Sequence, residues 1–188
     1  MNMRKIDDEI QALLSEHRGD IRSILKDNHR LDLLYALSSQ RELLLEWYDF
    51  EPEAEVLQVG ADYGALTGLL RSSVSAVTVL DDTESALETV RQRYPGAANI
   101  HYHKDSLTGY AAEACAEGKK YDYVIFAGTL TAPYEDHIHA AKALLKPEGI
   151  LIVASVNALG MKYFAGTVEE ENALTKRQLT ELLCGDRE

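Results

Sequence analysis

The chain has 188 residues, of which 46% are hydrophobic and 27% charged, and its formal net charge is −12. This length and composition predict a soluble globular domain with a substantial core and exclude disordered and fibrous classes. No apolar run approaches the roughly 18 residues that span a bilayer, and we expect no secretory signal. A nucleic-acid partner is disfavoured, because phosphate contacts need a basic face. The two cysteines have neither metal-type nor disulfide-type spacing, which indicates the cytoplasm.

Residues 1–50 are predicted to form a helical extension. Apolar residues recur three and four positions apart in two segments, which Gly19 and Asp20 separate. Ser39 and Glu42 have the spacing of a capping box and predict a further helix through residue 48. We expect these helices to cover a cofactor or to form a homodimer interface, and their apolar stripes fit both.

Short apolar runs alternate with helical patterns in residues 51–188. The predicted strands are residues 55–59, 75–80, 99–103, 121–127 and 150–156. The predicted helices between them are residues 63–72, 83–94, 110–117 and 134–146, each followed by a Gly or Pro signal or by an apolar run. This alternation predicts an α/β fold with a mostly parallel, Rossmann-like sheet. Beyond residue 157 the pattern is loop-like until Thr175 and Gln178, which have capping-box spacing and predict a last helix.

The first predicted strand runs into a glycine turn in the sequence VLQVGADYGALT, residues 56–67. In open α/β sheets this turn is the usual cradle for a nucleotide, and Gly60 and Gly64 suit its backbone. A dinucleotide-binding turn requires glycine where this chain has Asp62, whose carboxylate would repel a diphosphate. An acid at this position is compatible with S-adenosylmethionine (SAM), which has no phosphate and carries an ammonium and a sulfonium.

Two further acids follow the next two strands. Asp81 ends the second strand, where a carboxylate can accept hydrogen bonds from both ribose hydroxyls. Asp105 follows the third, where it can accept from an adenine amine. Each acid alone could instead cap a helix or lie solvated in a loop. Together with Asp62 they favour a nucleoside cofactor, and Asp62 argues against an NAD-dependent oxidoreductase.

Four stretches of the chain resemble class I SAM-dependent methyltransferases. More narrowly, they are similar to methyltransferase-like domains found beside glycosyltransferases in bacterial surface-polysaccharide proteins. The stretches are YALSSQRELLLEWYDF (35–50), VLQVGADYGALTG (56–68), YDYVIFAGTLTAPY (121–134) and SVNALGMKYFAG (155–166). The likeness covers about residues 33–166, and its most specific part is NALGMKYFAG.

This resemblance implies SAM as the cofactor and a set of residues that hold it. The implied cofactor-binding residues are Gln58, Gly60, Asp62, Gly64, Asp81, Asp105 and Ser106. Arg41 and Tyr35 are candidates for the methionine end of SAM, and Gly128 and Thr129 are expected near the transferable methyl group. We expect no metal site, since the pairs His101 with His103 and His137 with His139 lack a third ligand.

The sequence departs from the family pattern at several points. Gln58 and Ser155 stand where the family has Glu, Asp62 replaces the middle Gly, and residues 168–171 replace an EDHTG-like segment. The full fold also has two further strands, which the residues after Leu183 are too few to supply. We therefore expect either a piece of a longer protein or a shortened domain.

Residues 157–166 are the expected acceptor-side segment, because they follow the fifth strand at the ligand-binding edge. Asn157, Lys162 and Tyr163 are the candidate catalytic residues, with Tyr163 a candidate base. Alternatively, the apolar residues here only cover the sheet.

Two hypotheses follow. The chain is a methyltransferase acting on a small molecule or a saccharide, or it is a non-catalytic SAM-binding or docking module of a larger glycosyltransferase protein.

Overall fold

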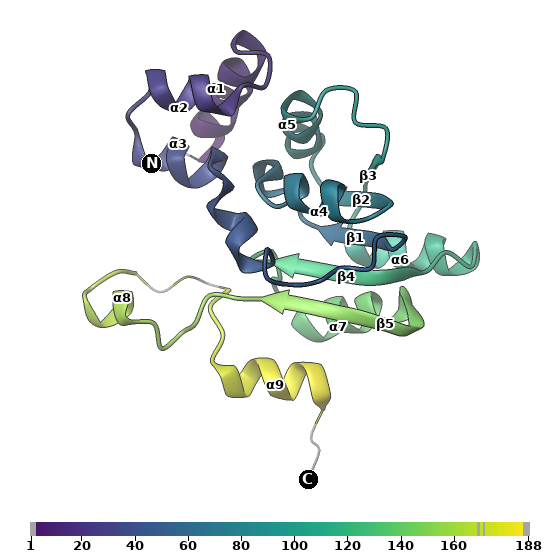
Figure 1. The fold of residues 1–188 in the computed structure, drawn as a ribbon. Coiled ribbons are helices and arrows are strands. Elements are labelled where there is room, and N and C mark those ends of the chain that lie inside the picture. Colours follow the sequence, from purple (N-terminus) through teal and green to yellow (C-terminus); the bar gives the residue numbers. More distant parts are fainter. Residues whose placement is uncertain (1–2, 169, 171, 186–188) are drawn as a thin grey trace. The chain divides into compact units, whose positions relative to one another are not determined.

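Figure 1 shows the computed structural model, which describes residues 3–168, 170 and 172–185, with side chains from residue 6 onward. Five strands form a mostly parallel sheet in the order β3-β2-β1-β4-β5, and helices flank it. The chain divides between Ser106 and Leu107 into two compact units. The predicted α/β, Rossmann-like fold is confirmed.

The first unit contains the three strands β1 (Glu55–Val59), β2 (Ala76–Asp81) and β3 (Ile100–Lys104). Neighbouring strands pair in parallel, Val56 with Val77 and Val77 with Ile100. The apolar residues inside β1 and β2, namely Val56, Leu57, Val77, Val79 and Leu80, are almost completely buried, as parallel strands covered on both faces require. Helices α4 (Thr67–Ser73) and α5 (Glu84–Arg93) follow β1 and β2.

Three N-terminal helices pack on one another, α1 (Met3–Glu16), α2 (Ile21–Asp27) and α3 (Leu31–Leu37). They lie together at the purple end of the chain in Figure 1. Their shared core consists of Ile10, Leu14, Ile24, Leu33 and Leu37, all fully buried. The predicted break between the first two helices is confirmed. Asp20 caps α2 by accepting hydrogen bonds from the backbone N–H groups of Arg22 and Ser23.

The helix predicted from Ser39 to residue 48 is wrong. A 3₁₀ helix, η1 (Ser39–Leu44), forms here instead. Its N-cap residue is Ser38, whose side chain makes no capping hydrogen bond, and its C-cap residue is Leu45. Leu43 and Trp47 are 65% and 76% exposed, so this segment lacks the buried apolar face that stabilises most α-helices in proteins.

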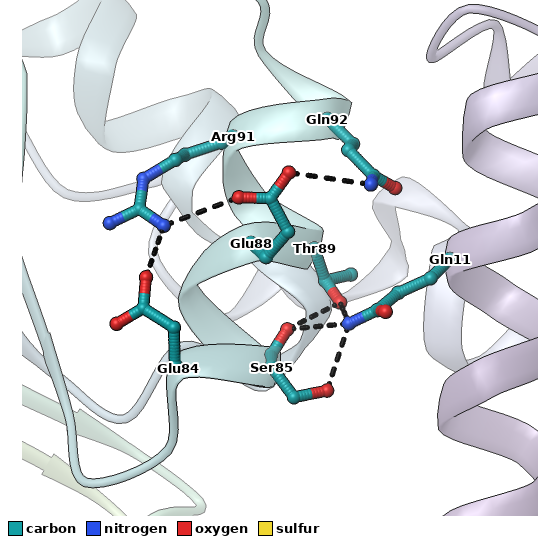
Figure 2. A network of polar contacts seen from close by, with 7 residues as sticks. All are labelled: Gln11, Glu84, Ser85, Glu88, Thr89, Arg91 and Gln92. Atoms are coloured by element: carbon teal, nitrogen blue, oxygen red, sulfur yellow. Dashed lines mark hydrogen bonds and ion pairs between the residues drawn. The ribbon is translucent and has the colours of Figure 1, made fainter.

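Polar contacts join α1 to α5. Figure 2 shows Gln11 of α1 reaching α5, where its amide donates to the carbonyl and hydroxyl oxygens of Ser85, both at 2.8 Å, and to Thr89 Oγ1 at 3.2 Å. After α1 the chain passes so close to α5 that a Cβ on Gly19 would lie 2.7 Å from the Gln92 carbonyl oxygen. The first helix is therefore positioned against the helix that follows β2.

The second unit contains β4 (Tyr121–Ala127), β5 (Leu145–Ala154), α6 (Leu107–Ala116) and α7 (Tyr134–Ala143). β5 begins at Leu145 rather than at the predicted residue 150. Its register against β4 shifts between Tyr121 and Tyr123, so that residues 146–149 form an irregular stretch inside the strand. Pro147 lacks an N–H for the ladder, and such an irregularity accommodates it.

The last described elements are α8 (Met161–Phe164) and α9 (Lys176–Cys184). The capping box predicted at Thr175 and Gln178 is confirmed, with each side chain bonded to the other residue's backbone N–H. Residues 157–174 are less irregular than predicted. Besides α8 they include a parallel bridge between Asn157 and Leu174. Among the described helices, none has the length and apolar content needed to cross a membrane.

Candidate functional site

The turn after β1 adopts left-handed backbone conformations. The φ angles are +87° at Gly60, +41° at Asp62, +53° at Tyr63 and +71° at Gly64. Residues 62–64 form the 3₁₀ turn η2 (Asp62–Gly64), so α4 begins at Thr67 rather than at the predicted residue 63. A left-handed conformation costs a non-glycine residue about 1–2 kcal/mol, so contacts elsewhere must hold Asp62 and Tyr63 in place.

The end of α5 lies directly against Gly64. A Cβ there would lie 3.1 Å from the Tyr94 ring and 3.2 Å from Arg93 Cδ. The Tyr94 hydroxyl donates to the Gly64 carbonyl at 2.8 Å. Burial is the main cause that raises the pKa of Tyr94, which keeps this donor protonated. The absence of a side chain at Gly64 therefore lets α5 approach the turn closely.

Gln58 lies in β1 and is 2% exposed. Its amide nitrogen donates to the Gly60 carbonyl at 3.0 Å, and its amide oxygen accepts from the Thr67 hydroxyl at 2.8 Å. Gln58 therefore ties the start of the turn to the start of α4. A glutamate here would set an acceptor against the Gly60 carbonyl, so the amide suits this particular turn.

Asp81, at the tip of β2, binds the turn directly. Its Oδ2 accepts from the Ala61 N–H at 2.9 Å, and its Oδ1 accepts from the N–H and the hydroxyl of Thr83 at 2.9 and 2.7 Å. A carboxylate has about four acceptor positions, and three of these are used. Asp81 can accept one further hydrogen bond without rearrangement, and a second once Thr83 turns its hydroxyl away.

Asp105 lies beside Asp81. The Asp105 N–H donates to the Asp81 carbonyl at 3.1 Å, and the Ser106 N–H donates to Asp105 Oδ1 at 2.7 Å. The structure thus brings Asp62, Asp81 and Asp105 to one edge, where the carboxyl ends of β1, β2 and β3 meet.

Asp62 faces two arginines. Its Oδ2 lies 3.4 Å from Arg41 Nε, an ion pair without hydrogen-bond geometry. Burial raises the pKa of Asp62, while Arg41 and Arg93 oppose that rise. Arg41 therefore lies next to the turn, whereas Tyr35, the other residue expected at the methionine end, is 69% exposed on α3.

Sequence reasoning missed two residues that hold the turn. Arg93 is 8% exposed, and its guanidinium donates to the carbonyls of Tyr63 at 3.0 Å and Leu37 at 2.9 Å. Tyr63 packs on the core of the N-terminal helices, and its hydroxyl donates to Asp7 Oδ1 at 2.6 Å. Burial and this bond raise the pKa of Tyr63. No local pattern marks either residue, because the partners lie 30 to 56 positions away.

In the second unit Gly128 and Thr129 follow β4, as expected. Gly128 has a φ of +82°, and its carbonyl accepts from the Asn172 amide at 3.2 Å. The Gly128 N–H donates to Ala154, which continues the pairing of β4 with β5.

Two of the three candidate catalytic residues, Asn157 and Lys162, form local hydrogen bonds. Asn157 Oδ1 accepts from the Leu159 N–H at 3.0 Å. Lys162 pairs with Glu170, and that hydrogen bond raises the pKa of Lys162. The Tyr163 hydroxyl is shielded from solvent and has no hydrogen-bond partner among the described residues. Residues 169 and 171, part of the departure from the EDHTG-like segment, lie outside the described residues.

No family model and no curated protein matches this sequence. Solved structures do match. A proposed methyltransferase from Bacillus halodurans is 17% identical with a TM-score of 0.60, over 77% of this chain and 67% of that one. The N-methyltransferase NodS from Bradyrhizobium japonicum, in complex with S-adenosylhomocysteine (SAH), is 16% identical with a TM-score of 0.55, over 70% and 64%.

A third matching structure is named as a decarboxylase rather than as a methyltransferase. Precorrin 8w decarboxylase from Methanobacterium thermoautotrophicum is 21% identical with a TM-score of 0.51, over 66% of each chain. The matched region is thus about two thirds of each of these proteins. At such identities the likeness establishes the fold and leaves the chemistry open. The chain has the fold of the class I SAM-dependent methyltransferases.

Proposed function

We propose that this chain is a SAM-binding methyltransferase domain. The observation that carries the proposal is the meeting of Asp62, Asp81 and Asp105 at the carboxyl edge of β1–β3, around a turn with an acid where diphosphate would lie. Ligands of open α/β sheets bind at this edge. A cationic nucleoside suits all three carboxylates, whereas Asp62 would repel the diphosphate of a dinucleotide.

The hydrogen-bonding and charged groups at this edge match the chemical groups of SAM. Asp81 would accept from the ribose, with one acceptor position available now and a second after rotation of the Thr83 hydroxyl. Asp105 and Ser106 would face the adenine. Arg41 lies near the turn and would meet the methionine carboxylate. Gln58 would act indirectly, by fixing the carbonyl of Gly60.

The acceptor and the cellular setting belong to the same proposal. The likeness at residues 155–166 supports a small-molecule or saccharide acceptor and a place in bacterial polysaccharide synthesis, beside an attached or separate glycosyltransferase. Both cysteines are free, which is compatible with a cytoplasmic location. The N-terminal helices could also form a homodimer interface.

The second candidate is a non-catalytic SAM-binding or docking module. It is favoured by one observation, namely that Asn157 and Lys162 are engaged in local contacts. The raised pKa of Lys162 also keeps its ammonium protonated, so Lys162 is no base.

Calorimetric titration with SAH and with NAD⁺ tests the proposed cofactor. We expect SAH to bind and NAD⁺ not to bind. Asp81→Asn should weaken SAH binding at least about tenfold, whereas the control Asp82→Asn, an exposed neighbour, should not. Thr83→Val should tighten SAH binding, because it frees an acceptor position on Asp81. A variant that only damages the fold would lose SAH affinity, so an increase in affinity cannot come from structural damage. NAD⁺ binding without SAH binding would refute the proposal.

A methyl-transfer assay separates the two candidates. The protein is incubated with SAM and amino or neutral saccharides, and SAH release is measured. Release that depends on the saccharide supports the enzyme. SAH binding without release from any acceptor supports the non-catalytic module.

A further inference from the structure

A cavity of about 530 Å³ lies in the first unit between α1, the η2 turn and the start of α5. Its lining residues are Asp7, Asp8, Asp62, Tyr63, Thr83, Ser85, Ala86 and Thr89. This volume is within the range of small-molecule sites. None of these eight is basic, a statement that holds for side chains from residue 6 onward, and Asp81 and Asp105 are not among them. The cavity therefore adjoins the proposed cofactor site through Asp62 and Thr83, but it does not include the two carboxylates proposed to contact the ribose and the adenine.

Three of the four hydroxyl groups that line the cavity already donate their protons to protein acceptors. Tyr63 donates to Asp7 at 2.6 Å, Thr83 donates to Asp81 at 2.7 Å, and Thr89 donates to the Ser85 carbonyl at 3.0 Å. Each hydroxyl carries one proton and two lone pairs. These three hydroxyls can therefore only accept hydrogen bonds from a ligand.

The carboxylates of the lining are acceptors too. Asp7 is held in place by Tyr63. The fourth hydroxyl, on Ser85, accepts from Gln11 and is the one lining hydroxyl among the described residues whose proton could still donate to a ligand (Figure 2). Arg41 offsets part of the charge on Asp62 but is not itself a lining residue. An anion or an acceptor-rich ligand would be repelled by this lining. An ammonium group, with three donors and no acceptor, matches it.

We propose that this cavity binds a small organic ammonium compound, whose amine donates to Asp7 and whose remaining donors meet the lining hydroxyls. The site is built from α1 and α5, which the Gln11 contacts hold together. This proposal does not rest on SAM binding at the sheet edge.

Calorimetry with D-glucosamine, ethanolamine and N-acetyl-D-glucosamine at mildly acidic pH provides the test. The acetylated sugar is the control, because it lacks the charge. We expect at least one of the two amines to bind about tenfold tighter than N-acetyl-D-glucosamine. Equal affinities, or no binding of either amine, would overturn the proposal.

Variants locate the site. Asp7→Asn removes the charge but keeps an oxygen that can accept from Tyr63, so amine affinity should fall about tenfold with little loss of stability. Glu16→Gln, the same change at the exposed end of α1, should have no effect. Ala86→Phe should fill the cavity and abolish binding, whereas Ala12→Phe on the exposed face of α1 should not. Circular dichroism confirms that each variant is folded. Amine binding unaltered in both Asp7→Asn and Ala86→Phe would overturn the proposal.

Titration of the amine in the presence of saturating SAH distinguishes this site from the cofactor site. We expect the amine to bind unchanged, and competition would contradict a separate site. If SAH itself does not bind, the methyltransferase proposal fails while the amine result stands.

Discussion

The turn at residues 60–64 and the segment at residues 157–166 differ in how they are held. The turn is bound by side chains from α1, β1, β2 and α5, and Arg93 and Gln58 among these are almost completely buried. The segment is bound by its own neighbours and is mostly exposed. The turn therefore has one conformation imposed from several directions, as a preorganised binding site requires. The segment has no such support.

The turn is the region proposed to bind the cofactor, and residues 157–166 are the region proposed to act in catalysis, so the difference concerns these two roles. Under the proposed function, a cofactor is recognised at the turn as it stands, apart from the Thr83 hydroxyl. An acceptor at residues 157–166 would have to replace local contacts before Asn157 or Lys162 could act. The predictions that follow test how strongly each region is tied into the fold.

The largest effect is expected for Arg93→Met. The variant leaves the carbonyls of Tyr63 and Leu37 without their buried donor, and each unsatisfied acceptor costs about 1–3 kcal/mol. We expect the free energy of unfolding in urea to fall by about 3 kcal/mol. Arg91→Met on the same helix is the control, since the contacts of Arg91 are weak ones, namely surface ion pairs with Glu84 and Glu88 (Figure 2) and a cation–π contact with Tyr102. Equal losses in the two variants would contradict the role of Arg93.

A smaller loss is expected for Gly64→Ala. Alanine would be strained at a φ of +71° and would press on Tyr94 and Arg93. The control is Gly96→Ala, with a φ of +73° and nothing within 4 Å of the added Cβ. Strain alone costs about 1 kcal/mol, and we expect Gly64→Ala to cost about 1 kcal/mol more. If both variants unfold at the same urea concentration, the approach of α5 to the turn is looser than described.

The third prediction concerns Asp62→Asn and its pH dependence. Burial raises the pKa of Asp62 in the folded state, so the folded protein binds its proton more tightly than the unfolded chain does. Ionised Asp62 therefore destabilises the fold, increasingly as the pH rises from the unfolded pKa through the folded one. Asparagine removes this penalty and also tolerates φ > 0.

We expect Asp62→Asn to stabilise the protein by up to about 1 kcal/mol near neutral pH. The gain should disappear as the pH falls to about 4. Urea unfolding at both pH values measures it. A neutral-pH loss of stability would mean that the ion pair with Arg41 outweighs the burial of the carboxylate.

The smallest effect is expected for Lys162→Met. Lys162 and Glu170 form an exposed ion pair, and such pairs contribute little. We expect no measurable change in the urea midpoint and no change in SAH affinity. A clear loss of either would show that residues 157–166 are tied into the fold as firmly as the turn.

Much of this fold could be predicted from the sequence. β1 and β4 have the predicted bounds, because their apolar runs are short and continuous and local pattern decides them. Predictions were wrong where tertiary contacts decide. The 3₁₀ helix at Ser39–Leu44 lacks a face to bury, and β5 extends through Pro147 only because β4 pairs with it in a shifted register.

In the candidate site too, some features could be predicted from the sequence and others could not. That Asp62, Asp81 and Asp105 meet at one edge could be predicted, because it follows from the parallel order of the strands. The roles of Arg93 and Tyr63 could not, because their partners come from remote parts of the chain. The hydrogen bond from Gln58 to the Gly60 carbonyl could not be predicted either. It depends on the left-handed turn, which the sequence indicates only through its two glycines.

Amide hydrogen exchange with and without SAH compares the two regions in one experiment. The Ala61 and Thr83 amides are bound to Asp81, and the Asp105 amide is bound to the Asp81 carbonyl. We predict that SAH slows exchange at residues 60–64, 81–83 and 105–106 and leaves residues 157–166 unchanged. Slower exchange at residues 157–166 with no change around Asp81 would contradict cofactor binding at the edge of β1–β3.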